Sequence, residues 1–318
     1  MNKQAQQYAL GIDLGGTSIK YGISSLEGNI VKEFKRSTQA DKPADIILED
    51  LINAAFAGIQ DAKNIGISIS AIGIGTPGSV NVETGFLSGS TPNLKNWRNV
   101  PIKERLEARL KLPVFADNDA NIMAFGETRF GAGIGYSDVV CITLGTGIGG
   151  GIIISNQIFR GSFYAGAELG HMSIAYDGTK CRCGGIGCWE KYASATAMIE
   201  RYNELDSKAN ITDTVQIFEN YDRNEPVAKQ VVEEEVEMVA AGLANLVNVF
   251  NPQIIIIGGG LSEVGEWFIN RISEATGNRA MECAMKNVQI VKAKLGNKAG
   301  WLGAAAFALE QAPKESCL

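Results

Sequence analysis

The chain has 318 residues, of which 45% are hydrophobic and 20% charged, with a formal net charge of −6. This length suits two domains of ordinary size, and an acidic balance without a basic run disfavours a nucleic-acid-binding protein. The sequence has no run of about 18 uninterrupted apolar residues, which a membrane-spanning helix needs. We therefore expect a globular protein that binds neither nucleic acid nor a membrane.

The N-terminal segment and the cysteines indicate the compartment. The first residues, MNKQAQQYALGID, contain no apolar signal core before the first expected strand, so we expect a cytoplasmic protein. A disulfide framework would distribute paired cysteines through a small secreted domain. Here three of the six cysteines crowd together and three stand apart, a pattern that indicates a metal site; the two sets are Cys181, Cys183 and Cys188, and Cys141, Cys283 and Cys317.

The first half of the chain alternates apolar runs with stretches of helical periodicity. Ile47, Leu51 and Ala55 recur at helical spacing, and the apolar runs end at glycine or other turn residues, as strands do. Such alternation predicts a layered α/β domain. We expect strands over 8–15, 19–25, 29–34, 68–78 and 112–119, and helices over 43–64, 102–110 and 120–130.

A second cycle begins near Asp138, and its opening repeats that of the first. ITLGTGIGGGII resembles IDLGGTSIKYGI, and each reads as strand, glycine-rich hairpin turn and strand. We expect strands over 138–145, 150–155, 252–260 and 287–293, and helices over 232–250, 263–272 and 298–312. The sequence thus predicts two related α/β domains that face a cleft. One is a small domain of residues 1–119, with or without the C-terminal helix 298–312, and the other a larger domain of residues 120–297.

Two segments match the dinucleotide-binding pattern G-x-G-x-x-G, but in the wrong context. That site needs the glycines to follow a strand and open a helix. Here they lead into SVNVETG and GIIIS, neither of which reads as a helix, and the Walker phosphate loop is absent. A nicotinamide dehydrogenase and a P-loop enzyme are therefore both disfavoured. The two matches are Gly73-Gly75-Gly78 and Gly145-Gly147-Gly150.

The hairpin turns themselves are candidate phosphate sites. Turns such as Gly15-Gly16-Thr17 and Gly145-Thr146-Gly147 leave backbone N–H groups that can hold phosphate oxygens. Asp13, just before the first turn, could hold Mg²⁺ directly or through water. The alternative is that the glycines only allow a positive φ in tight hairpins. Two equivalent turns in two equivalent halves favour phosphate binding.

The clustered cysteines lie close to the only histidine of the chain, His171. Nine residues separate His171 from Cys181, one separates Cys181 from Cys183, and four separate Cys183 from Cys188. One histidine and three cysteines form a closed tetrahedral set for a structural zinc ion. The alternative is three free thiols and an unrelated histidine, which the density of the cluster disfavours.

The glycine turns resemble those of a superfamily that includes sugar kinases, actin and heat-shock chaperone ATPases. IDLGGTSIKYG, ITLGTGIGGG and IIIIGGG carry this resemblance. It implies a two-domain, actin/hexokinase-like (ribonuclease H-like) α/β fold whose two turns clamp the phosphates of ATP. It also implies that Lys20 lies near the first turn and that Gly258, Gly259 and Gly260 border the nucleotide.

The segment from ELGH to CRCGGIGCWE closely resembles the signature of the ROK family of bacterial sugar kinases and sugar-responsive repressors. Zinc binding through one imidazole nitrogen leaves the other free for a neighbour, so the metal can orient a sugar-binding surface. Transfer to a sugar hydroxyl needs a carboxylate that accepts the hydroxyl proton. The candidate is Asp119 in FADNDAN, at a strand–helix junction, and not the nearby Asp117. The alternative role for Asp119 is a helix cap.

The ROK resemblance implies an ATP-dependent hexose kinase that uses Mg²⁺, with glucose as the first expectation. N-acetylglucosamine, N-acetylmannosamine and other hexoses are alternative substrates, and relatives are usually homodimers or homotetramers. A sugar-sensing repressor is disfavoured, because the first strand begins by about Tyr8 and leaves no room for a helix-turn-helix domain. By this resemblance Asp119 is the general base, and the sugar contacts are Gly78, Asn93, Asn118, Asp119, Glu168, His171 and Glu190.

Overall fold

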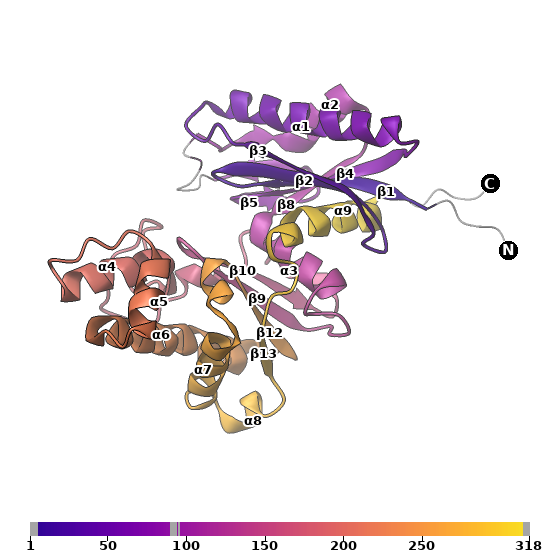
Figure 1. Ribbon diagram of the computed structural model, residues 1–318. Helices are drawn as coiled ribbons and strands as arrows, with labels where there is room; N and C mark the ends of the chain where they lie inside the picture. Colours follow the sequence, from indigo (N-terminus) through magenta and orange to yellow (C-terminus); the bar gives the residue numbers. More distant parts are fainter. Residues whose placement is uncertain (1–5, 90–93, 95, 314–318) are drawn as a thin grey trace. The chain divides into compact units, whose positions relative to one another are not determined.

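The computed structural model describes residues 6–89, 94 and 96–313 (Figure 1). It divides into two compact units. Unit 1 contains the chain up to Gly131, the segment Arg160–Gly166 and the chain from Asn297 on, and unit 2 contains Ala132–Phe159 and Ala167–Gly296. None of the helices formed by the described residues is long and apolar enough to cross a membrane.

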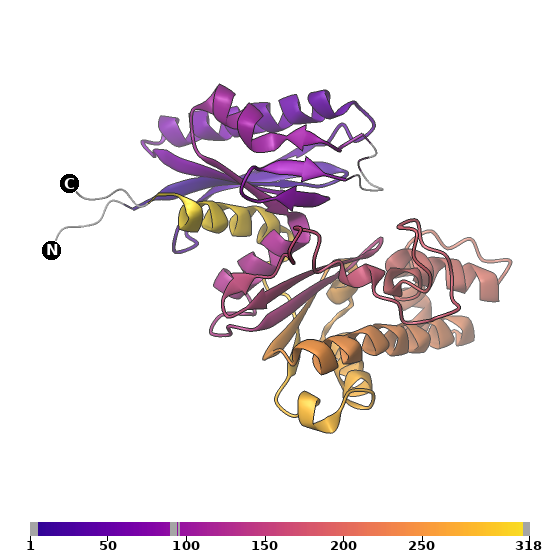
Figure 2. The same ribbon diagram turned by 180° about the vertical axis from the view of Figure 1, so that it is seen from behind.

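Unit 1 is built on a five-stranded sheet in the order β3-β2-β1-β4-β8. The first three strands are antiparallel neighbours, and β4 and β8 continue the sheet in parallel with β1. Helices α1 and α2 lie on one face of the sheet, and α9 and α3 on the other (Figures 1 and 2). A small sheet of β5, β6 and β7 lies in the same unit. The bounds are β1 (Tyr8–Leu14), β2 (Ser18–Ser25), β3 (Ile30–Ser37), α1 (Ala44–Asn64), β4 (Ile69–Thr76), β5 (Ser79–Asn81), β6 (Phe86–Ser88), β7 (Val100–Pro101), α2 (Ile102–Leu110), β8 (Val114–Asn118), α3 (Asp119–Phe130) and α9 (Ala299–Gln311).

Unit 2 repeats this order in a second five-stranded sheet, β11-β10-β9-β12-β13. Again a hairpin of antiparallel strands is followed by strands parallel to the first of them. Its bounds are β9 (Val139–Leu144), β10 (Ile148–Ile154), β11 (Gln157–Ile158), α4 (Ala195–Leu205), α5 (Thr214–Asp222), α6 (Pro226–Phe250), β12 (Ile254–Gly258), α7 (Glu266–Gly277), α8 (Glu282–Met285) and β13 (Gln289–Lys292), with 3₁₀ turns η1 (Leu169–His171), η2 (Trp189–Lys191), η3 (Gly260–Val264) and η4 (Gly296–Lys298), of which η4 spans the junction with unit 1.

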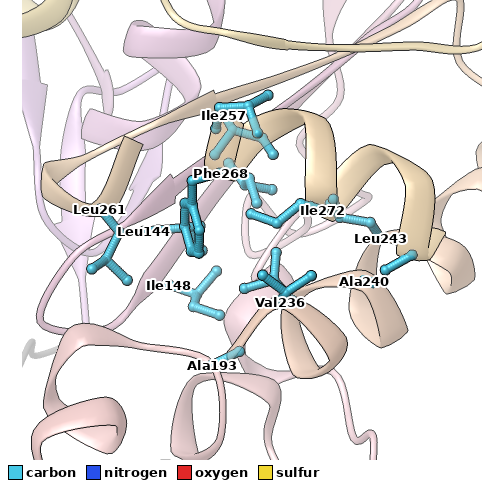
Figure 3. Packing of buried hydrophobic residues seen from close by; sticks show 14 of the residues in the cluster. Leu144, Ile148, Ala193, Val236, Ala240, Leu243, Ile257, Leu261, Phe268 and Ile272 are labelled. Carbon is cyan, nitrogen blue, oxygen red and sulfur yellow. The ribbon is translucent and has the colours of Figure 1, made fainter. Parts of the chain in front are cut away.

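The hydrophobic core of unit 2 packs against the residues that flank its glycine-rich segments. Figure 3 shows the ring of Phe268, on α7, close to Leu144 and Leu261. All three side chains are fully or almost fully buried. Leu144 directly precedes Gly145, and Leu261 directly follows Gly260. Apolar packing therefore fixes the strand end and the 3₁₀ turn that flank both segments.

The predicted hairpins are confirmed, because β1 pairs with β2 and β9 pairs with β10, both antiparallel. The pattern did not predict α4, α5 or the small β5–β7 sheet. The first part of unit 1 extends to Gly131, whereas the sequence analysis divided the chain after residue 119. The difference is α3, which packs against α9: a Cβ atom on Gly126 would lie 2.5 Å from the carbonyl oxygen of Ala299.

Helix α9 lies unusually close to the sheet of unit 1. A Cβ atom added to Gly11 would lie 1.8 Å from the carbonyl oxygen of Trp301, and one added to Gly73 would lie 1.8 Å from that of Ala304. No real Cβ atom tolerates such a distance, and the obstacle is backbone, which cannot rotate away. Glycine is therefore required at these strand positions so that the helix backbone can contact the strand backbone.

Replacing Gly73 by Ala is expected to destabilise the protein by at least the 1–3 kcal/mol typical of overpacking. The added methyl group has to push α9 away from β4. Urea unfolding followed by circular dichroism measures the change. Gly277→Ala is the matched control, because a Cβ atom there meets nothing within 4 Å; it should leave stability unchanged or raise it slightly. Equal stability of the Gly73 variant and the wild type would contradict the close packing.

Candidate functional site

The first candidate phosphate turn lies in unit 1, at the end of β1. Asp13 pairs with Lys20 across the β1–β2 hairpin. The turn is closed by the amide of Gly15, which donates to the carbonyl of Ser18 at 3.0 Å. The hydroxyl of Thr38 donates to the carbonyl of Gly15 at 2.7 Å. The structure thus brings Asp13, Lys20 and the turn Gly15-Gly16-Thr17 together.

Asp13 is electrostatically perturbed. Burial raises its pKa from 3.8 to about 6, and the opposing charge of Lys20 only partly offsets this. Part of the burial comes from α9: a Cβ atom on Gly300 would lie 2.6 Å from the Cγ of Asp13. Lys20 itself donates to the side chain of Asn297 at 2.8 Å. A carboxylate held in this way lacks part of its hydration, which a cation beside it would replace.

The second group in unit 1 surrounds the β8–α3 junction. Asn118 caps α3, since its side-chain oxygen accepts from the amides of Ala120 at 2.9 Å and Asn121 at 3.2 Å. Its side-chain amide donates to the carbonyl of Gly78 at 3.2 Å. Asp119 is the first residue of the helix and accepts from the amide of Ala120 at 2.9 Å. Gly78, Asn118 and Asp119 therefore form one local cluster, in which Asn118, and not Asp119, occupies the cap position.

Asp117, which directly precedes this cluster in the chain, is buried and paired with an arginine. It is 1% exposed, and Arg160 contacts its Oδ2 through both Nε and Nη2 at 2.7 Å. Burial is the largest influence on its pKa and raises it, while Arg160 acts in the opposite direction. The sequence analysis did not identify Arg160, because no local pattern links it to a position 43 residues earlier in the chain.

The second candidate phosphate turn lies in unit 2, between β9 and β10. The amide of Gly145 donates to the carbonyl of Gly147 at 3.0 Å. The start of α4 covers the turn from outside: the amide of Ala195 donates to the carbonyl of Gly145 at 2.8 Å, and the hydroxyl of Thr196 donates to that of Thr146 at 2.8 Å. The N-terminus of a helix and the turn thus lie together.

Backbone strain does not explain the glycines of either turn. Gly15, Gly16, Gly145 and Gly147 are all outside the set of described glycines with positive φ. A Cβ atom on Gly145 would meet nothing within 4 Å, so open space lies beside it. This argues against the hairpin-only alternative. The late glycine segment adjoins the same turn, since a Cβ atom on Gly259 would lie 2.4 Å from the carbonyl oxygen of Leu144.

The four predicted metal ligands converge in unit 2. The ligand atoms of His171, Cys181, Cys183 and Cys188 all lie within 4.8 Å of one another. The sulfur atoms of Cys183 and Cys188 are 3.6 Å apart, and that of Cys181 is 3.7 Å from Nδ1 of His171. Zinc–sulfur bonds of about 2.3 Å in a tetrahedron separate two sulfurs by about 3.8 Å. The donor set and its spacing therefore fit a structural zinc ion.

The glycines of this loop allow the convergence. Gly184 and Gly187 have φ values of 97° and 72°, which other residues rarely adopt. At Gly187 a Cβ atom would also lie 1.7 Å from the carbonyl oxygen of Ala175. Cys181 is tied to the other strand of the loop, because its amide donates to the carbonyl of Gly185 at 2.8 Å. The loop is thus folded around the ligands by its own backbone.

Glu190 lies between the predicted metal ligands and the candidate phosphate turn of unit 2. Its Oε1 lies 3.5 Å from Nδ1 of His171 and 3.3 Å from the sulfur of Cys181. Its Oε2 lies 2.6 Å from where a Cβ atom of Gly147 would be. Because Nδ1 of His171 faces the cysteines, Nε2 is directed to other neighbours. Glu168 directly precedes the 3₁₀ turn that contains His171, and its backbone carbonyl accepts from the amide of His171 at 3.0 Å. Asn93, the remaining predicted sugar contact, lies outside the described residues.

Comparison with known proteins places this arrangement in a family. The ROK family model matches residues 9–311. A glucokinase of Streptomyces coelicolor is 38% identical over 96% of this chain and 98% of its own length. The crystal structure of a ROK family glucokinase from Streptomyces griseus, in complex with glucose and AMPPNP, superimposes with a TM-score of 0.80 at 38% identity, covering 95% of this chain and 99% of that one. A xylose repressor of Caldicellulosiruptor bescii is 33% identical over 94% of this chain and 77% of its own length.

The chain therefore belongs to the ROK family, and the resemblance in its motifs is confirmed. The predicted fold class, the α/β fold of ROK and hexokinase-like sugar kinases, is confirmed as well. Kinases and repressors share the body of this fold among the relatives. Family membership alone thus does not assign a reaction.

The cysteine cluster predicts about one zinc ion per chain. Replacing Cys183 by Ser should reduce the zinc content well below one equivalent, because only three ligands remain. Cys183 is exposed, so its loss removes little packing. Cys283→Ser is the matched control, since that thiol is also exposed and lies outside the cluster. Metal analysis of the purified proteins measures the content. Full zinc occupancy in the Cys183 variant would contradict the assignment.

Replacing Asp13 by Asn should stabilise the protein more at pH 8 than at pH 5. The carboxyl has a pKa of about 6 when folded and about 3.9 when unfolded. A raised folded-state pKa means that its stabilising contribution is complete below about pH 4 and is lost as the pH rises through about 6. Removing the charge should therefore raise the free energy of unfolding at pH 8 by on the order of 1–3 kcal/mol.

Urea unfolding at both pH values measures this difference. Asp41→Asn is the control for the loss of one negative charge, because Asp41 is exposed in the same unit. It should change the free energy of unfolding little at either pH. A gain for the Asp13 variant that is independent of pH would show that the carboxyl is not the group responsible.

Proposed function

We propose that this protein is an ATP-dependent glucokinase that converts glucose and ATP to glucose 6-phosphate and ADP. The observation that carries the proposal is the similarity, over almost the whole chain, to glucokinases of 38% identity, one of them crystallised with glucose and an ATP analogue. The carboxylate and the two glycine turns that this reaction needs are present in the chain. ATP in the cytoplasm is the expected phosphoryl donor.

In this proposal Asp119 is the general base. The oxygen of the sugar 6-hydroxyl forms a bond to the γ-phosphorus, the bond from that phosphorus to the β,γ-bridging oxygen breaks, and the hydroxyl proton passes to the Asp119 carboxylate. Asn118 and Gly78 are proposed to contact the sugar, and their hydrogen bond at 3.2 Å supports a shared role. Asn93 is proposed as a further sugar contact from the family resemblance.

The nucleotide is proposed to bind at the glycine turns. Gly15, Gly16 and Thr17 and the equivalent Gly145, Thr146 and Gly147 would donate backbone amides to phosphate oxygens. The open space beside Gly145 supports this assignment. Asp13 would hold Mg²⁺, directly or through water, with Lys20 beside the phosphates. The segment Gly258, Gly259 and Gly260 would lie against the adenosine.

Zinc is proposed to be structural, bound by His171 and the three clustered cysteines. It would neutralise the thiolates and fix the imidazole ring, so that Nε2 of His171 can contact a sugar hydroxyl. Glu190, which lies 3.5 Å from Nδ1 of that ring, and Glu168, whose backbone carbonyl accepts from the amide of His171, are proposed as further sugar ligands. We also propose an assembly of identical subunits, a dimer or a tetramer.

A coupled assay of ADP release tests the proposal with ATP, Mg²⁺ and a panel of hexoses and N-acetylhexosamines. We expect a kcat/KM for glucose at least about 100 times that for the acetylated sugars. Asp119→Asn should lower kcat about 10²–10⁴-fold, the usual contribution of a general base. Its glucose Kd, measured by calorimetry, should stay close to that of the wild type.

Asp41→Asn, an exposed position in the same unit, is the matched control and should keep wild-type kcat. A preference for an N-acetylated sugar would replace the substrate and keep the reaction class. Sugar binding without turnover of any sugar would favour the sensor function of the repressors in this family. Near-normal activity of Asp119→Asn would disprove the base assignment.

A further inference from the structure

The segment Arg160–Gly166 belongs to unit 1, although its neighbours in the chain do not. Phe159 before it and Ala167 after it are both part of unit 2. The chain thus leaves unit 2 for seven residues and then returns. Nothing in the composition of the segment requires this path, because it is short, largely polar or small, and has no helix or strand. Its contacts explain it.

Arg160 is the principal contact of the segment with unit 1. Its Nε donates to Oδ2 of Asp117 at 2.7 Å, and its Nη2 lies 2.7 Å from the same oxygen. Its guanidinium also lies over the ring of Phe307 on α9, 5.5 Å from the centroid. Later in the segment, Tyr164 interacts with Glu83, which is also in unit 1. Arg160 thus fixes the start of the segment to this unit.

Asp117 uses its second oxygen to organise the β8–α3 junction. Oδ1 accepts from the amide of Asn118 at 2.7 Å and from the side chain of Asn121 at 3.2 Å. Both carboxylate oxygens are thus engaged by protein donors, and the residue is buried. A carboxylate with these partners cannot also act on a substrate. It can instead determine the conformation of the residues that follow it.

We propose that Arg160 and Asp117 form a positioning pair that holds Asp119 in its reactive orientation. The inference rests on the proposed kinase function. Asp119 follows two residues after Asp117, and the intervening Asn118 is fixed on both sides, by its cap on α3 and by its bond to Gly78. A shift of Asp117 therefore moves the backbone that carries the Asp119 carboxylate. A displacement of about 1 Å at a reacting group lowers a rate by about 10²-fold.

Lysine cannot replace Arg160 fully, because a single ammonium nitrogen cannot reproduce the contact of two guanidinium nitrogens with the Asp117 oxygen, and it stacks less well on a ring.

Arg160→Lys is the test, since it keeps the charge beside Asp117 and loses the fork-shaped contact. We expect kcat to fall about 10- to 100-fold, while the glucose Kd, the KM for ATP and the zinc content stay within about threefold of the wild type. Arg129→Lys is the matched control. Arg129 also pairs with a carboxylate, that of Glu310, at 2.8 Å, and lies over a ring, that of Phe125, at the far end of α3. Its kcat should stay within about twofold.

A second variant keeps the test valid if Arg160→Lys folds poorly. Asp117→Asn combined with Arg160→Gln removes both charges together, so that no buried charge is left unpaired. This double variant should fold, and its kcat should fall about as far as that of Arg160→Lys while its glucose Kd stays nearly unchanged.

A kcat within twofold of the wild type in either folded variant would overturn the inference. So would a parallel loss of kcat, glucose binding and thermal stability, which a purely structural pair would produce. A wild-type chain that phosphorylates no sugar would instead overturn the proposed function, together with this inference. An active wild type with unaffected variants would overturn the inference alone.

Discussion

The contact between the backbone of α9 and the sheet of unit 1 is the constraint on which the candidate site of that unit depends. Glycines at positions 11 and 73 let the backbone of α9 contact the strand backbone. Gly303, on α9 itself, lets that helix contact the backbone of α3 at Ile122. At the start of α9, Gly300 packs closely against the side chain of Asp13. Because β1 carries Asp13 and α3 begins at Asp119, a helix from the end of the chain fixes two carboxylates from its first half. The burial that raises the pKa of Asp13 to about 6 follows from the same packing.

In unit 2, Glu190 is held in place both by the cluster of His171 and the cysteines and by the hydrophobic core. Glu190 is flanked by the cluster of His171 and the cysteines on one side. On the other side its neighbour Trp189 is fully buried, and the indole N–H donates to the carbonyl of Met238 on α6 at 2.8 Å. Gly242 leaves the space for that indole, since a Cβ atom there would lie 2.1 Å from it. A metal bound by the cluster would therefore complete a loop that the hydrophobic core already holds at its far end.

Local patterns predicted those features that short stretches of chain determine. The two glycine hairpins, the buried strands and the cluster of His171 with three cysteines all follow from spacing within about 20 residues. The docking of α9 on β1 joins positions nearly 300 residues apart, and the Asp117–Arg160 pair joins positions 43 residues apart. Periodicity carries no information about such contacts. Helices α4 and α5 were missed for a related reason: short amphipathic helices in a polar stretch depend on the core they pack against.

Two carboxyl groups with raised pKa values, those of Asp13 and Glu235, have different surroundings. Glu235 is fully buried, and burial raises its pKa to about 7, as burial raises that of Asp13. Glu235, however, is paired with Arg201 at 2.7 Å, between α4 and α6, and packs among apolar side chains of the core. Asp13 lies instead beside a glycine turn whose residues have no need of positive φ. What separates the two is the neighbouring backbone: Asp13 lies in a hairpin of small residues beside a turn, whereas Glu235 lies between two helices and is neutralised by Arg201.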